Sequence, residues 1–116
     1  MNIFLILLGA TLIGTCDSIG QTQAEMNETA NNNFNKADKE LNTLYVKLTQ
    51  MLSDEEKQLL KIAQRDWLKF RDSHCKFEIV ESDGGSIQPL LYSMCLTETT
   101  EERIEDLKEA IKSRTH

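Results

Sequence analysis

Proline and histidine are nearly missing from this sequence: the 116 residues contain one Pro and two His. Runs of β-branched residues are also few, whereas Leu, Lys, Glu, Gln and Ala are plentiful, and this mixture favours helices over strands. His74 is the one histidine in the body of the chain, and neither a His-x-x-x-His pair nor a paired CxxC motif occurs. Zinc sites need such ligand spacings, so we expect no metal and no other cofactor. The composition therefore predicts an all-α domain without a metal centre.

Motifs that carry catalysis are missing as well. No glycine-rich phosphate loop follows a strand, and no Gly-x-Ser-x-Gly elbow occurs. His74 and Cys75 are neighbours in the sequence, but adjacent residues of a helix point about 100° apart, so they do not form a nucleophile–base pair. We therefore expect a protein that is not an enzyme. The opposite hypothesis requires Cys75 to be a free, reactive thiol.

Positive charge is in short supply. The 19 acidic residues outnumber the 13 lysines and arginines, which gives a formal net charge of −6. A negative surface disfavours nucleic acid and anionic membranes as main partners, and it steers a basic protein towards the molecule. The alternative interpretation is that modest acidity only keeps a small domain soluble.

No apolar run is long enough to cross a bilayer. The longest run, residues 3–14, is followed by small and polar residues, and a membrane-spanning helix needs about 20 apolar residues. This pattern is typical of a secretory signal peptide, although no Lys or Arg precedes the apolar run. We predict a signal peptide over residues 1–20 with cleavage within 14–24, a folded domain over 21–116, no membrane span, and a periplasmic or secreted protein.

The three cysteines are Cys16, Cys75 and Cys95. Export to an oxidising compartment allows two of them to pair. Cys75 and Cys95 both lie in the mature domain, and their bond would close a loop of about 20 residues, which stabilises a fold by about 3 kcal/mol. Cys16 is then free or removed with the signal peptide. The alternative is a lipid-anchored Cys16, but Thr15 precedes it where Gly, Ala or Ser is usual.

Two capping boxes mark the expected starts of helices. Thr22-x-x-Glu25 and Ser53-x-x-Glu56 both have the spacing in which the side chain of the first residue and that of the fourth cap each other's backbone. The turn before Ser53 is short, so the two helices are expected to fold back antiparallel.

The second helix is expected to run to about Val80. Segment 81–89 then contains two adjacent glycines that end the helix and turn the chain. Pro89 suits the first turn of a third helix. Threonines within 97–100 allow a break there, so we predict a small antiparallel bundle of three helices with one disulfide, or four helices if the third breaks.

The second helix carries the single Trp of the chain within a stripe of apolar residues at steps of three and four, which predicts a buried face. The stripe consists of Leu60, Ala63, Trp67, Phe70 and Phe77, with His74 in the remaining position. Polar residues run beside it, and among them Arg71 is expected to brace the first helix through Asp38 or Asn42. The predicted structural core is Leu41, Tyr45, Ala63, Gln64, Trp67, Phe70 and Arg71.

Four groups of residues are similar to a known family. They are Gln21-Thr22-Gln23-Ala24-Glu25-Met26-Asn27, Ala37-Asp38-x-x-Leu41-Asn42-x-x-Tyr45, Ala63-Gln64-x-x-Trp67-x-x-x-Arg71-Asp72-x-x-Cys75, and Gly84-Gly85-Ser86 followed by Cys95. In this order and at this spacing, the mature chain resembles the LprI-like lysozyme-inhibitor domain of bacterial envelope proteins.

The resemblance implies a helical, exported, disulfide-stabilised protein. It also implies binding to lysozyme, a small basic glycosidase, and blocking of the lysozyme cleft, and it brings no catalytic residues. The chain departs from the family at Thr29, where members have a cysteine that pairs with one near Cys16. Cys16 therefore lacks its expected mate.

The leading hypothesis is an exported binding protein that inhibits lysozyme-type muramidases, with an acidic surface that attracts the basic enzyme. The predicted contact is the loop 81–88 through Glu81, Asp83 and Ser86. The alternative for this loop is a plain connection between two helices. The alternative function is a non-inhibitory envelope structural or stress protein that binds another cell-wall component or partner.

Overall fold

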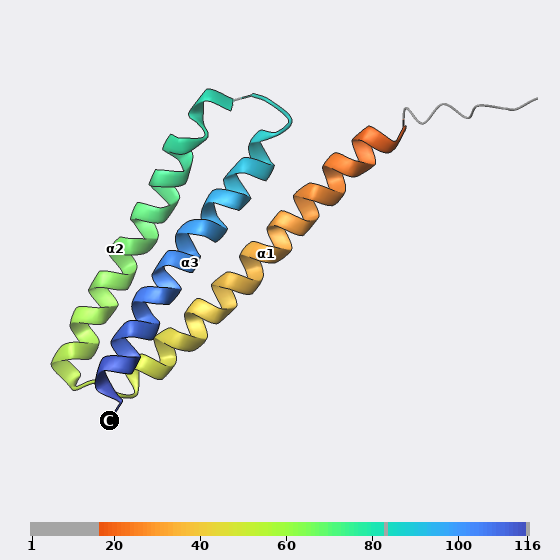
Figure 1. The fold of residues 1–116 in the computed structure, drawn as a ribbon. Coiled ribbons are helices and arrows are strands. Elements are labelled where there is room, and N and C mark those ends of the chain that lie inside the picture. The colour runs from red at the N-terminus through yellow and green to blue at the C-terminus, as the bar shows by residue number, and fades with distance from the viewer. Residues whose placement is uncertain (1–16, 83, 116) are drawn as a thin grey trace, which may run out of the picture.

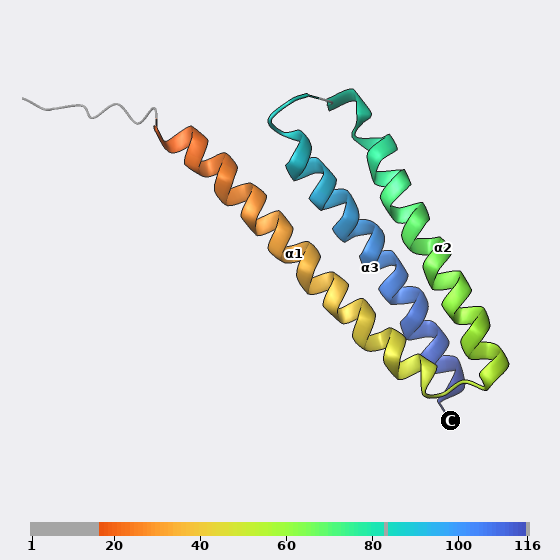
Figure 2. The same cartoon turned by 180° about the vertical axis from the view of Figure 1, so that it is seen from behind.

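The computed structural model describes residues 17–82 and 84–115, with residues 17–21 described by their backbone alone. The chain forms α1 (Asp17–Thr49), α2 (Asp54–Glu78), one turn of 3₁₀ helix η1 (Val80–Ser82) and α3 (Gln88–Arg114). The described residues contain no strand, so the predicted all-α class is confirmed. Figures 1 and 2 show α3 between α1 and α2, with α1 and α3 running in one direction and α2 in the other.

The turn between α1 and α2 is fixed by the capping box at Ser53. The backbone N–H of Glu56 donates to Ser53 Oγ at 3.3 Å, and the backbone N–H of Ser53 donates to Glu56 Oε1 at 3.1 Å. The hydrogen bond from the Ser53 backbone is the main reason that the pKa of Glu56 lies below its usual value. Arg114 at the end of α3 lies 3.6 Å from the same carboxylate. The capping box therefore sets where α2 begins, and the ion pair with Arg114 joins this turn to the end of α3.

The start of α1 differs from the prediction. The helix begins at Asp17, so Thr22 and Glu25 lie inside it and do not cap its first turn. A capping box requires an N-cap residue outside the helix, and here helical backbone already precedes Thr22. Most of the predicted signal peptide, including Cys16, lies outside the described residues.

The core is built mainly between α1 and α3, which share the most extensive contact among the helices. Leu41 on α1 is 1% exposed. The buried core residues are Ala37, Leu41, Leu48, Ile104, Leu107 and Ile111, and Leu44, Tyr45, Leu52, Leu60, Trp67 and Ala110 pack against them. Their three- and four-residue steps place them on facing sides of the two helices. Burial of each large aliphatic side chain contributes roughly 1.5–3 kcal/mol.

The buried face of α2 lies beside the predicted apolar stripe. Gln64, Arg71 and Cys75 are buried, and Gln64 accepts a hydrogen bond of 3.1 Å from Arg103 Nε of α3. Ala63 is exposed, and Phe70 is 56% exposed. The prediction that Ala63 and Phe70 belong to the core is therefore wrong. The bond from Cys75 to α3 fixes the rotation of α2, and this rotation turns Phe70 to solvent.

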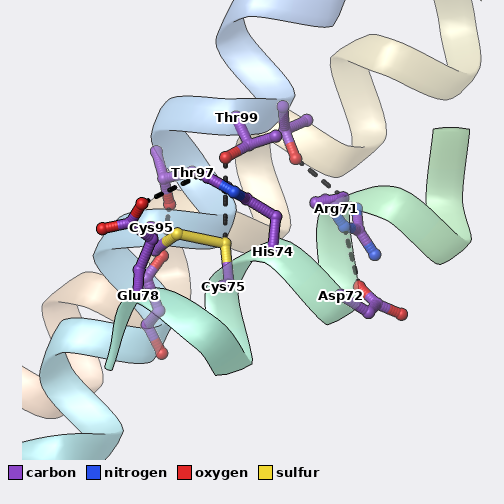
Figure 3. The surroundings of a disulfide bond; sticks show 10 residues. Arg71, Asp72, His74, Cys75, Glu78, Cys95, Thr97 and Thr99 are labelled. Carbon is purple, nitrogen blue, oxygen red and sulfur yellow. Dashed lines mark hydrogen bonds and ion pairs between the residues drawn. A yellow bond between two sulfur atoms is a disulfide. The ribbon is translucent and has the colours of Figure 1, made fainter. Parts of the chain in front are cut away.

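The disulfide between Cys75 and Cys95 is present, with 5.6 Å between the two Cα atoms. It joins α2 to α3, as predicted, and Figure 3 shows its surroundings. Thr99 Oγ1 of α3 lies 3.8 Å from the Cys75 sulfur. The predicted pairing of the two late cysteines is confirmed.

The third helix is continuous, so the four-helix alternative does not apply. Thr97 donates its hydroxyl hydrogen to the Ser93 carbonyl at 3.0 Å, one turn back in the same helix. Thr99 and Thr100 are buried against α2. The threonine hydroxyls thus have partners within the helix or across its packed face, and the helix has no need to break there.

Arg71 reaches from α2 to both other helices. Its Nη1 donates to Thr100 Oγ1 of α3 at 3.4 Å and lies 3.7 Å from Asp38 Oδ1 of α1. The guanidinium carbon lies 5.1 Å from the Phe34 ring centroid and 5.4 Å from that of Trp67. The predicted contact between Arg71 and Asp38 is therefore present, and aromatic faces cover the cation on the α1 and α2 sides.

Loss of the disulfide should weaken the fold. We expect the Cys75→Ala, Cys95→Ala double variant to lower the free energy of unfolding by about 3 kcal/mol, because the bond closes a loop in the unfolded chain. Urea denaturation followed by circular dichroism measures the difference. Equal midpoints for the oxidised protein and the variant would contradict this expectation.

Truncation of the buried Arg71 should lower the free energy of unfolding about as much as loss of the disulfide does. We expect Arg71→Ala to destabilise the protein by roughly 2–4 kcal/mol, because the fully buried Thr100 hydroxyl loses its donor and a cavity opens beside Trp67. The matched control is Lys69→Ala on the exposed side of α2, expected to change stability by less than about 0.5 kcal/mol. Thermal denaturation measures the change in melting temperature of each variant. Similar changes in the two variants would contradict the role given to Arg71.

Candidate binding groove between helices α2 and α3

A groove of about 640 Å³ lies between α2 and the N-terminal half of α3, next to the disulfide. We call it the α2/α3 groove. Its lining residues are Phe70, His74, Glu78, Ile79, Leu91, Met94, Cys95, Glu98, Thr99 and Glu102. The groove therefore combines aromatic and aliphatic side chains with carboxylates.

Helical spacing explains how the sequence forms the two walls. Phe70, His74 and Glu78 follow one another at steps of four on α2, so they lie in one row. On α3 the same spacing aligns Met94 and Glu98. The Cys75–Cys95 bond holds the two rows beside each other.

The apolar part of the groove is open to solvent. Met94 is 54% exposed, and the Phe70 ring stacks on the His74 ring with 5.3 Å between centroids. Phe77, two turns beyond Phe70 on the same face of α2, is 71% exposed. Large exposed apolar side chains that gather in this way mark interaction surfaces.

The charged rim of the groove is acidic. Glu78, Glu98 and Glu102 line it, and no lysine or arginine is among the lining residues. His74 Nε2 lies 3.6 Å from Glu78 Oε1 on the same helix, and Figure 3 shows this pair beside the disulfide. A rim of this sign attracts a basic partner and repels an acidic one.

The loop predicted to contact a partner continues from the end of α2. Glu81 lies in η1, and Ser86 lies just before α3; both are exposed. Asp83 lies outside the described residues. Gly84 has a backbone φ of 76°, a conformation that glycine adopts without strain, and this allows the chain to turn. The loop therefore stands open at the disulfide end of the bundle.

Other kinds of site have little support in the described part of the chain. No three His, Cys, Asp or Glu side chains there gather closely enough to hold a metal ion. None of the helices described is long and apolar enough to cross a membrane. The Cys75 sulfur is bonded to Cys95, so a free Cys75 thiol is not available for catalysis.

The α2/α3 groove was not predicted as a unit. The sequence predicts Phe70 and His74 on the buried face of the second helix. Cys75 was the signal in the sequence that could have shown which face of α2 is buried. Because Cys75 bonds to α3, Arg71 and Trp67, which lie four and eight positions before it, must face the same way. This register places Arg71 at the buried seam and leaves Phe70 outside.

The described residues thus form a small helical protein with one disulfide and an open acidic groove. The profile of the family described as "Lysozyme inhibitor LprI" matches residues 16–107. An uncharacterized protein of Rhizobium meliloti (strain 1021) is 34% identical, over 79% of this chain and 76% of that protein. No solved structure matches. The chain belongs to the lysozyme inhibitor LprI family.

Exposed groove residues should be replaceable without loss of the fold. We expect Phe70→Ala to change the free energy of unfolding by less than about 1 kcal/mol, because the side chain is largely solvated. Leu41→Ala in the core should cost roughly 2–5 kcal/mol. Urea denaturation of the two variants compares them directly. A cost for Phe70→Ala as large as that for Leu41→Ala would place Phe70 in the core after all.

Proposed function

We propose that this protein binds lysozyme-type muramidases outside the cytoplasm and inhibits them, with the α2/α3 groove and the loop 81–88 as its contact surface. Membership of the lysozyme inhibitor LprI family supports lysozyme as the partner. The proposed location, periplasmic or secreted, follows from the same membership and from the apolar N-terminal run of the sequence.

The observation that carries the proposal is the combination of exposed apolar side chains and carboxylates in one groove. Glu78, Glu98 and Glu102 line it together with Phe70 and Met94, and both of these apolar side chains are exposed. Carboxylates of this kind speed the association of a basic enzyme more than they tighten the final complex. Desolvation of aromatic and methionine side chains then supplies binding free energy, as anchor residues do in other interfaces.

Inhibition requires coverage of the lysozyme cleft and no chemistry on this chain. A glycosidase holds its two catalytic carboxylates on either side of the bond that it cleaves, so any protein seated across the cleft excludes the polysaccharide. We place the loop residues Glu81, Asp83 and Ser86 against basic residues on the rim of that cleft. The rigid disulfide end of the bundle would hold the loop and the groove in one orientation for docking.

The test is a cell-wall lysis assay with purified mature protein and lysozymes of the c-type and the g-type. We expect micromolar protein to slow lysis by at least one of the two enzymes. The double variant Glu78→Gln, Glu102→Gln should inhibit about five- to twentyfold less well, because two rim carboxylates are neutralised. Added salt should reduce inhibition by the unaltered protein.

The matched control removes the same charge elsewhere. Glu25→Gln with Glu101→Gln neutralises two exposed carboxylates that do not line the α2/α3 groove, and inhibition should stay within about twofold. Unchanged lysis by both enzymes in the presence of the unaltered protein would contradict the inhibitor function. Unchanged lysis together with co-purification with envelope material would point to the non-inhibitory envelope protein instead.

A further inference from the structure

A second groove, of about 620 Å³, lies between α3 and the N-terminal half of α1, and it shares Met94 and Glu98 of α3 with the α2/α3 groove. We call it the α1/α3 groove. Figures 1 and 2 show α1 diverging from α3 towards the N-terminal end of α1. This part of α1 and the N-terminal half of α3 line the groove. Met26 and Ala30 of α1 and Leu90 and Met94 of α3 form its apolar floor.

The charge and the flexibility of this lining select a particular kind of ligand. The charged residues that line the groove are Glu25 on α1 and Glu98 and Glu101 on α3, and all are acidic. Met26 is 43% exposed, and Met94 is exposed beside it in the same groove. Methionine is unbranched and polarizable, so it adapts to apolar partners of varied shape. The lining therefore fits a ligand that is apolar on one face and basic at its edges.

The length of the groove fits a short helix. Its α1 wall runs from Thr22 to Asn33, which at about 1.5 Å per residue is roughly 16 Å, or three helical turns. A helix of about 11 residues would match the length of this wall. Such a ligand would take the position of a fourth helix, next to two helices that are already in place.

We propose that the α1/α3 groove binds a cationic amphipathic helix. Its apolar face lies on Met26 and Met94, and its lysines or arginines pair with Glu25, Glu98 and Glu101. This is the helix-in-groove mode of recognition, in which apolar anchors at helical spacing enter a methionine-lined groove. The proposal does not depend on lysozyme inhibition, because it concerns the groove between α1 and α3 and a ligand of peptide size.

The experiment uses a labelled 14-residue peptide of leucine and lysine arranged with one apolar face. Fluorescence anisotropy with the purified protein is expected to give saturable binding of one peptide per chain that weakens as salt is added. Two peptides serve as controls: the same composition scrambled so that no apolar face forms, and a leucine–glutamate peptide of the same pattern. Neither should bind at the concentrations at which the first one does.

Two double variants with the same change of charge locate the site. Glu25→Gln with Glu101→Gln should raise Kd about five- to twentyfold, whereas Glu78→Gln with Glu102→Gln in the α2/α3 groove should leave it within about twofold. Met26→Gln tests the apolar floor and should also weaken binding. Circular dichroism verifies that each variant keeps its helix content.

Three results would overturn the proposal. The first is no saturable binding by the amphipathic peptide. The second is an equal rise of Kd in the two double variants, since binding would then follow net charge alone. The third is a homodimer, seen by light scattering, that Met26→Gln dissociates and that the peptide does not displace, since a second copy of the chain would then occupy the groove. Lysozyme inhibition can fail or succeed under each of these results.

Discussion

A buried guanidinium links the three helices. The main core joins α1 to α3, and α2 packs against α3, so few backbone contacts hold α2 to α1. Arg71 has hydrogen-bonding or charged partners on all three helices. They are Asp38 on α1, its neighbour Asp72 on α2 and Thr100 on α3. Burial of a cation is costly, and these partners together with two aromatic faces offset the cost. The planar, permanently charged guanidinium suits several partners at once, which a lysine would not match.

The burial of Arg71 leaves the aromatic side of α2 exposed to solvent. Because Arg71 and Cys75 face inwards, Phe70 and His74 stand at the edge of the α2/α3 seam, and the carboxylates of α3 lie opposite them. The helices and the disulfide hold this surface in one arrangement, so the proposed docking would cost less entropy than docking of a flexible surface. Met94 and Glu98 of α3 line both grooves, so α3 lies between the two proposed contact surfaces.

The sequence predicts two kinds of feature: those that depend on residues close together in the chain, and the disulfide, which depends on the pairing of cysteines. The Ser53 capping box and the Cys75–Cys95 bond are of these two kinds, and the helical class and the short first turn belong to the first. The rotation of α2 is different, because Phe70 is more apolar than Arg71, yet Arg71 is the buried one. Apolar content alone therefore selects the wrong face. The grooves depend in addition on the angles between helices, which the packing of the whole chain sets.

Docking of lysozyme on the α2/α3 groove is tested most directly by hydroxyl-radical footprinting of the protein with and without the enzyme. The exposed side chains of Phe70 and Met94 should be oxidised in the free protein and protected in the complex. Met51, exposed near the turn between α1 and α2 at the other end of the bundle, should be oxidised equally in both. Protection of Met51 with none at Phe70, or no protection at all, would contradict docking at this groove.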